Sequence, residues 1–114
     1  SKTAAEQYIV QSGLNFVSFR LANVYGPRQD PDGEAGVIAI FSKRMLEGRQ
    51  VIIYGDGEQT RDFIYASDVS QACEMVQHIQ ESITVNIGSG IATSVNKIAT
   101  IISKQADYSL SPRH

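Results

Sequence analysis

The chain contains 114 residues, enough for one domain with a hydrophobic core and few for two. A hydrophobic fraction of 42% and a charged fraction of 19% are typical of a folded globular protein. The net charge of −2 argues against a nucleic-acid partner, whose binding depends on clustered cations. The sequence shows no membrane-length apolar run, no signal-peptide pattern and no metal-ligand spacing. We therefore expect a cytoplasmic protein with no metal, membrane or nucleic-acid partner.

The single cysteine, Cys73, excludes an intrachain disulfide and suits a reducing compartment. It lies in a helical pattern with apolar neighbours, which favours a buried thiol over a nucleophile.

The first segment opens without Met, straight into a helical pattern that ends at Ser12 and Gly13. A chain that begins inside a helix suggests a piece of a longer protein. Residues 15–21 are rich in aromatic and β-branched side chains, which predicts a strand. A long polar loop is expected over residues 25–36.

In the middle of the chain, the apolar periodicity predicts a helix over Val37–Glu47 that Gly48 ends. Its apolar stripe could extend to Leu46. Residues 51–54 predict a short strand closed by the Gly55-Asp56-Gly57 turn, and residues 61–65 predict a second extended segment.

In the last third, Asp68 is the expected N-cap of a helix that runs to Ile79. A strand is expected over residues 84–87, and a final helix capped by Ser94 follows it. The tail from Asp107 to His114 has no periodicity and is expected to be loose. Alternating helices and strands predict an α/β fold with parallel pairing, although four short strands make a thin sheet.

Three polar side chains are candidates for binding a ligand. Asn23 follows a strand, at the end where α/β folds bind ligands. Arg61 follows a glycine-rich turn and could bind phosphate through two hydrogen bonds. Tyr54 offers a ring face to a base. The structural alternatives are a turn-capping Asn23, a surface ion pair between Arg61 and Asp62, and a core tyrosine.

The acidic loop over residues 30–34 (DPDGE) resembles a cation site superficially. It lacks the ligand spacing of a calcium loop, so we interpret it as a solvated turn.

Several segments occur together in a fixed order: 1–6 (SKTAAE), 20–29 (RLANVYGPRQ) and 55–68 (GDGEQTRDFIYASD). They resemble the extended short-chain dehydrogenase/reductase family, specifically its NAD-dependent nucleotide-sugar epimerases and dehydratases. Residues 33–41 (GEAGVIAIF) are similar to the UDP-glucose 4-epimerase branch, and residues 86–90 (NIGSG) continue the resemblance.

The resemblance implies a catalytic and cofactor-binding role for Lys2, as the lysine of a Tyr-x-x-x-Lys motif. In the family this lysine binds the nicotinamide ribose and lowers the pKa of the tyrosine base. The tyrosine is expected three residues before Ser1, and the sequence contains no glycine-rich dinucleotide loop. Leu21 and Ala22 would line the nicotinamide side, although several epimerases have Tyr-Phe there.

The resemblance also implies the substrate-binding residues. Asn23 and Arg61 would bind the diphosphate, together with backbone amides of Gly36 and Val37 at a helix start. Ile52 and Tyr54 would flank the uracil or another base.

Taken together, we expect an α/β fragment that joins a substrate-binding lobe to the last strands and helices of a Rossmann-type domain. Residues 1–27 and 68–105 would belong to the NAD-binding domain, and residues 28–67 to the substrate-binding lobe. The expected function is binding of a nucleotide-sugar, a UDP-sugar, in an NAD-dependent epimerase, which is an isomerase. The isolated chain would be inactive, and would form a homodimer or otherwise self-associate. The alternatives are a dehydratase of the same family and a stand-alone, non-catalytic binding module.

Overall fold

The computed structural model describes residues 1–33 and 36–114. Its five strands are β1 (Val17–Leu21), β2 (Asn23–Tyr25), β3 (Thr60–Tyr65), β4 (Ile83–Ile87) and β5 (Ala92–Ser94). They form two small sheets: β1 pairs in parallel with β4, and β3 lies between a parallel β2 and an antiparallel β5. The predicted α/β fold with parallel pairing is therefore confirmed.

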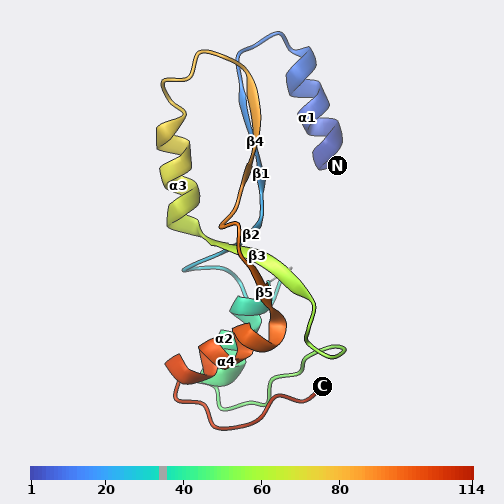
Figure 1. The fold of residues 1–114 in the computed structure, drawn as a ribbon, viewed down its shortest axis with the longest axis vertical. Coiled ribbons are helices and arrows are strands. Elements are labelled where there is room, and N and C mark those ends of the chain that lie inside the picture. The colour runs from blue at the N-terminus through green and yellow to red at the C-terminus, as the bar shows by residue number, and fades with distance from the viewer. Residues whose placement is uncertain (34–35) are drawn as a thin grey trace.

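Four helices complete the architecture: α1 (Lys2–Gln11), α2 (Val37–Leu46), α3 (Ala66–Met75) and α4 (Val95–Gln105). In Figure 1, α1 and α3 lie on either side of the β1–β4 pair, whereas α2 and α4 lie at the other end of the molecule. The result is an elongated shape of 54 × 25 × 24 Å. None of the helices in the described ranges is long and apolar enough to cross a bilayer.

The helix ends follow the local sequence signals. The Ser1 hydroxyl caps α1 by accepting a hydrogen bond from the Ala4 amide, and Gly13 follows the helix with a φ of 76°. The predicted Ser94 cap is confirmed, because its hydroxyl accepts from the Lys97 amide at 3.1 Å. Gly48 follows α2 with a φ of 69°, a left-handed conformation that glycine adopts without strain.

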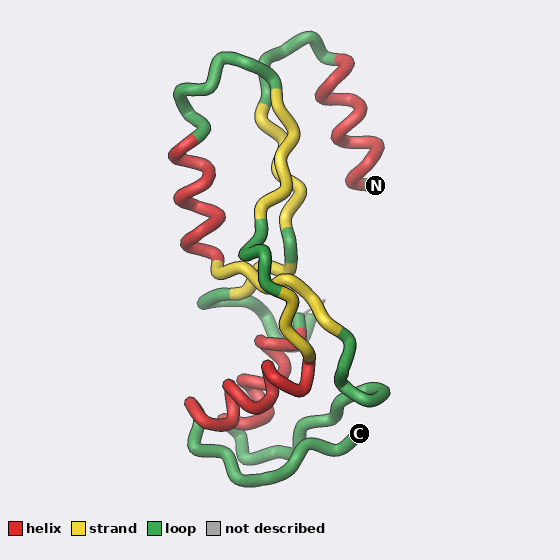
Figure 2. The backbone as a smooth tube through the Cα atoms, in the orientation of Figure 1, coloured by secondary structure: helices red, strands yellow, loops and turns green. Residues whose placement is uncertain are grey.

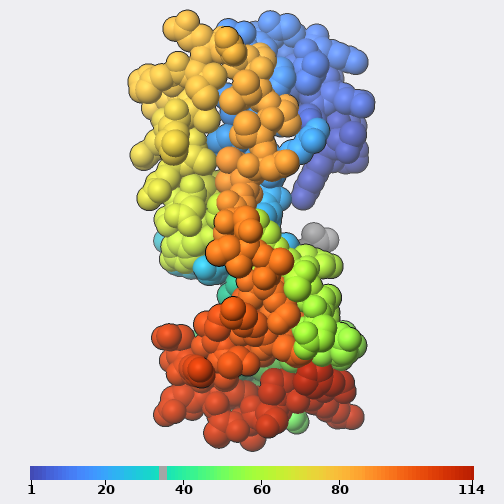
Figure 3. All heavy atoms as spheres, in the orientation of Figure 1, coloured from blue at the N-terminus to red at the C-terminus, as the bar shows by residue number. Residues whose placement is uncertain are grey.

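The hydrophobic core lies between α2, α4 and the segment that follows α2. Its buried side chains are Phe41, Met45, Val51, Ile53, Ile98 and Ala99. In the space-filling view the core lies in the lower part of the molecule, which is coloured green, orange and red. The upper part is blue, yellow and light orange (Figure 3). No residue of α1, β1, α3 or β4 is buried, so the two ends differ greatly in packing.

Four expectations for the helices are wrong. Asp68 does not cap α3: β3 runs directly into the helix, so Tyr65 occupies the N-cap position and Asp68 lies in the first turn. The helix also ends at Met75, short of Ile79. Cys73 is exposed rather than buried, because α3 buries none of its residues. Leu46, at the end of α2, is likewise exposed and lies outside the core.

The segment 51–54 and the tail also differ from expectation. Residues 51–54 do not form a strand; Ile52 makes only an isolated parallel bridge with Arg113. Two hydrogen bonds form this bridge: the Ile53 amide donates to the Arg113 carbonyl, and the Arg113 amide donates to the Val51 carbonyl. The tail is therefore docked rather than loose. The Tyr108 hydroxyl strengthens the docking by donating to the Arg49 carbonyl at 2.7 Å.

Two strands were not predicted. Asn23 lies in β2 rather than in a loop, and β5 pairs with β3 immediately before α4. Both are three-residue strands, and both lie in the sheet where the yellow segments cross the middle of the molecule in Figure 2.

Candidate functional site

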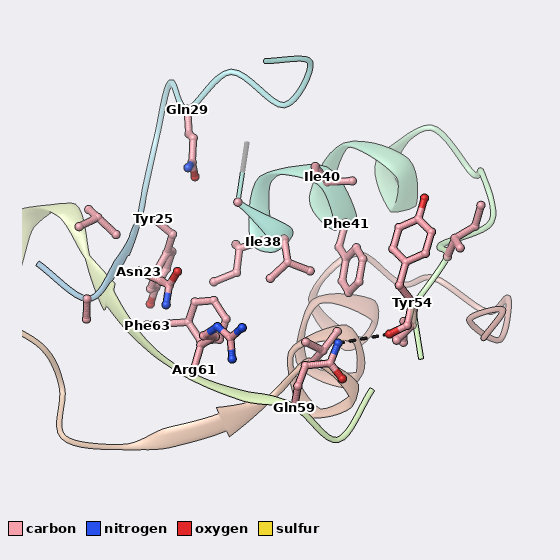
Figure 4. A pocket seen from close by; sticks show the side chains of 17 residues that line it. Asn23, Tyr25, Gln29, Ile38, Ile40, Phe41, Tyr54, Gln59, Arg61 and Phe63 are labelled. Carbon is pink, nitrogen blue, oxygen red and sulfur yellow. Dashed lines mark hydrogen bonds between the residues drawn. The ribbon is translucent and has the colours of Figure 1, made fainter. Parts of the chain in front are cut away.

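A pocket of about 630 Å³ lies between β2, β3, α2 and the segment after α2 (Figure 4). Its volume is in the range of small-molecule sites. The residues that line it come from several elements: Ala22, Asn23, Val24, Tyr25, Gln29, Gly36, Val37, Ile38, Ile40, Phe41, Ile52, Ile53, Tyr54, Gln59, Arg61, Phe63 and Val95. Most are apolar, so a few polar groups dominate its chemistry.

Arg61 is the one charged side chain among these lining residues. It lies on β3 beside Phe63, and its side chain is exposed. The Arg61 Nη1 atom donates to the Thr60 carbonyl at 2.8 Å, and no carboxylate pairs with it in the described ranges. The alternative of an Arg61–Asp62 ion pair is therefore wrong. An unpaired guanidinium at a pocket wall favours an anionic ligand.

Asn23 lies next to Arg61 in the pocket, as the close view shows (Figure 4). Its Nδ2 donates a long hydrogen bond of 3.4 Å to the Asp62 carbonyl, which joins β2 to β3 through a side chain. Asn23 therefore contributes to the strand pairing rather than capping a turn, and the second hydrogen of its Nδ2 can donate to an acceptor in the pocket.

Tyr54 lies at the far end of the pocket from Asn23 (Figure 4), and Ile52 also lines the pocket. The Tyr54 ring is 83% exposed, so the alternative of a core tyrosine is wrong. Gln59 anchors this wall, because its Nε2 donates to the Tyr54 carbonyl at 3.3 Å. An exposed ring beside an apolar side chain can stack on a planar heterocycle.

The start of α2 forms another wall. Gly36 is the N-cap and carries no side-chain cap, and both Gly36 and Val37 line the pocket. The first backbone amides of a helix have no partner within it and carry a partial positive charge. This wall therefore adds anion-binding capacity to that of Arg61.

Lys2 and Leu21 do not line this pocket, whereas Ala22 does. Lys2 is exposed on α1. The side chain that ties α1 to β1 is Glu6, whose carboxylate accepts two hydrogen bonds from the Arg20 guanidinium of β1, the shorter at 2.7 Å. That pairing lowers the pKa of Glu6 and raises the pKa of Arg20, chiefly through the shared hydrogen bond. Of the three expected cofactor-binding residues, only Ala22 lines the pocket, and the cofactor roles of Lys2, Leu21 and Ala22 remain predictions.

Asp62 is a polar residue whose role the sequence did not indicate. Its Oδ1 accepts from the Ser89 hydroxyl and from the Ser89 amide at 2.9 Å, and its Oδ2 accepts from the Gly90 amide at 3.0 Å. The Ser89 hydroxyl, followed by these two amides, lowers the pKa of Asp62. The Gly88-Ser89-Gly90 turn was the available signal, because tight turns present free amides to acceptors.

The acidic loop is confirmed as a surface turn over its described residues. The Lys43 ammonium pairs with Asp32 at 2.7 Å, and the Asp32 amide donates to Asp30. Hydrogen bonding to Asp32 raises the pKa of Lys43. Within residues 1–33 and 36–114, no three His, Cys, Asp or Glu side chains gather as a metal site. Residues 34 and 35, which belong to this loop and to the epimerase-like segment 33–41, lie outside the described residues.

These features define an α/β chain with a mostly apolar pocket that carries one arginine and the start of a helix, and its family follows from comparisons with known proteins. The model of the NAD-dependent epimerase/dehydratase family matches residues 1–88. The UDP-glucose 4-epimerase of Mycolicibacterium smegmatis is 47% identical over 83 residues, covering 72% of this chain and 26% of that protein. A UDP-N-acetyl-alpha-D-glucosaminuronate decarboxylase of Bacillus cytotoxicus is 39% identical over 89 residues, covering 76% of this chain and 27% of that protein.

A solved structure shows the same fold. The UDP-glucose 4-epimerase of Thermotoga maritima, determined with UDP-glucose, superposes with a TM-score of 0.88 and 42% identity. The superposition covers 97% of this chain and 36% of that one. The chain therefore belongs to the NAD-dependent epimerase/dehydratase family, as its sequence motifs predicted. It spans about a third of the length of the structure it matches.

Proposed function

We propose that this chain forms the nucleotide-sugar-binding part of a cytoplasmic, NAD-dependent nucleotide-sugar epimerase. The observation that carries the proposal is the pocket, in which Arg61 and Asn23 lie at one wall, the start of α2 at a second wall and Tyr54 at the far end. Residues 28–67 supply most of its lining, in keeping with their assignment to a substrate-binding lobe.

The chemistry of the pocket suits a nucleoside diphosphate. Arg61 would neutralise the diphosphate, while Asn23 and the backbone amides of Gly36 and Val37 would direct hydrogen bonds at its oxygens. Ile52 and Tyr54 would flank the uracil. The UDP-glucose in the Thermotoga maritima structure is the ligand of the matching protein and supports a UDP-sugar here.

The cofactor of the family is NAD, which supplies hydride transfer when bound. Lys2 would bind the nicotinamide ribose, and Leu21 and Ala22 would line the nicotinamide side of the cofactor. The chain spans only about a third of the length of the Thermotoga maritima epimerase. We therefore propose that the 114-residue chain binds the nucleotide-sugar weakly and does not turn it over.

The proposal is tested by titrating UDP-glucose into the ¹⁵N-labelled chain and following amide chemical shifts. We expect saturable shifts at Val37 and near Arg61, and no UDP-galactose after prolonged incubation with NAD. Turnover by a preparation free of longer enzyme would contradict the inactivity, and an absence of saturable shifts would contradict the binding.

A dehydratase or decarboxylase of the same family is the second candidate, favoured by the 39% identity to the decarboxylase. A stand-alone binding module is the third. A chimera that joins this chain to the remaining segments of a UDP-glucose 4-epimerase would separate the three candidates. Only an epimerase would return UDP-galactose.

We also propose that the chain self-associates through α1 and the β1–β4 pair, where large apolar side chains are exposed. Tyr8 on α1 is 77% exposed, and its neighbours Ile9 and Val10 are also exposed. Sedimentation velocity at increasing concentration should show a dimer or larger species that Tyr8→Glu weakens. Leu46→Glu is the matched control at the opposite end. A monomer at every concentration would contradict this prediction.

A further inference from the structure

Asp62 connects three parts of the molecule that contribute to or adjoin the pocket. Its carboxylate accepts three hydrogen bonds from Ser89 and Gly90, in the connection between β4 and β5. Its backbone carbonyl accepts the side-chain amide of Asn23 from β2. A single residue of β3 therefore contacts both a pocket-lining side chain, that of Asn23, and the 88–90 turn.

The turn lies where the chain passes from one sheet to the other. β4 belongs to the two-stranded sheet and β5 to the three-stranded sheet, and the Ala22 amide donates to the Ile87 carbonyl at 2.9 Å beside this crossing. In Figure 1 the same crossing lies at the middle of the molecule, between the upper and lower ends.

Close packing at this crossing requires a glycine. A Cβ at Gly88 would collide with the Asp62 carboxylate and would lie 3.2 Å from the Ala22 Cβ. The carboxylate therefore occupies the space that a larger residue at position 88 would fill. Asp62, Gly88 and Ala22 form a tightly packed unit that adjoins the pocket, because Ala22 is one of its lining residues.

Successive side chains of a strand point to opposite faces of the sheet. While Arg61 lines the pocket, Asp62 is thus directed away from it, toward the turn. We infer that Asp62 is a positioning residue, which holds β3 against the 88–90 turn and so sets where Arg61 and Asn23 meet the anionic ligand. This inference rests on the proposed assignment of those two residues to a diphosphate.

The test is Asp62→Asn in the 114-residue chain. The variant side chain can accept through Oδ1, but its Nδ2 cannot accept from the Gly90 amide. We expect Gly90 amide exchange to accelerate about tenfold, as for loss of one hydrogen bond worth about 1.4 kcal/mol. We also expect the side-chain NH₂ signals of Asn23 to shift, and the Kd for UDP to rise about tenfold.

Asp56→Asn is the matched control. Asp56 lies in the 55–57 turn, accepts from the Glu58 amide through Oδ1, and loses the same charge on substitution. We expect it to leave the Asn23 signals and the Kd for UDP within about twofold of the original chain, since the Oδ1 acceptor is retained. A general charge effect on UDP binding would instead appear in both variants.

The outcomes are distinguishable. If the original chain does not bind UDP, the proposed function fails, while the Gly90 exchange and the Asn23 signals still test the connection. Unchanged exchange and unchanged Asn23 signals in a folded Asp62→Asn would overturn the inference, as would a lower melting temperature with an unchanged Kd. If Asp62→Asn does not fold, Ser89→Ala removes a single donor and should shift the Asn23 signals in a smaller, measurable way.

Discussion

Replacing Phe41 with alanine is expected to lower the free energy of unfolding by about 3–5 kcal/mol, the usual cost of removing a buried aromatic side chain. Phe41 is 4% exposed and lies in the core formed by α2, α4 and the segment around Ile53. The loss is a large part of the total stability expected for a domain of this size. Urea unfolding followed by circular dichroism would measure it.

Leu46→Ala is the control for this prediction, because the same helix carries it and it is 77% exposed. We expect a change within about 0.5 kcal/mol, as for most surface substitutions. Equal destabilisation by both variants would show that the core between α2 and α4 does not form as described. Phe41 also lines the pocket, so unfolding rather than ligand binding is the appropriate measurement.

Replacing Arg61 with alanine is expected to weaken UDP binding by about tenfold to a hundredfold. The estimate follows from a charge-assisted hydrogen bond worth about 1.5–3 kcal/mol, with each 1.4 kcal/mol equal to tenfold in Kd. Arg61 is the one charged lining residue described, so no neighbouring cation replaces it. Amide shifts on titration with UDP would measure the change.

Two further variants sharpen this experiment. Arg61→Lys keeps the charge but loses the planar fork of donors, so it should restore only part of the affinity. Arg49→Ala removes an arginine that pairs with Glu47 at 3.2 Å, away from the pocket lining. It should leave UDP binding unchanged. Equal losses in Arg61→Ala and Arg49→Ala would indicate a dependence on net charge rather than a defined site.

Local sequence determined the start of α4 and the end of α2, whereas both ends of α3 differ from the local prediction. The Ser94 cap of α4 and the glycine that ends α2 act within a few residues of the chain, so their effects can be read without knowing the fold. The family motifs around Asn23 and Arg61 likewise brought together residues that do line one pocket. The roles that the motifs imply for Lys2 and Leu21 remain predictions.

Only the tertiary structure decided which strands pair and what Asp62 does. Val51 and Ile53 have the composition of a strand, but the partner available to them is the tail at Arg113, which allows one bridge. Asp62 looked like a partner for its neighbour Arg61, whereas its carboxylate bonds a turn 27 residues further along the chain. Strand register and carboxylate partners depend on contacts distant in sequence, and the local pattern does not contain them.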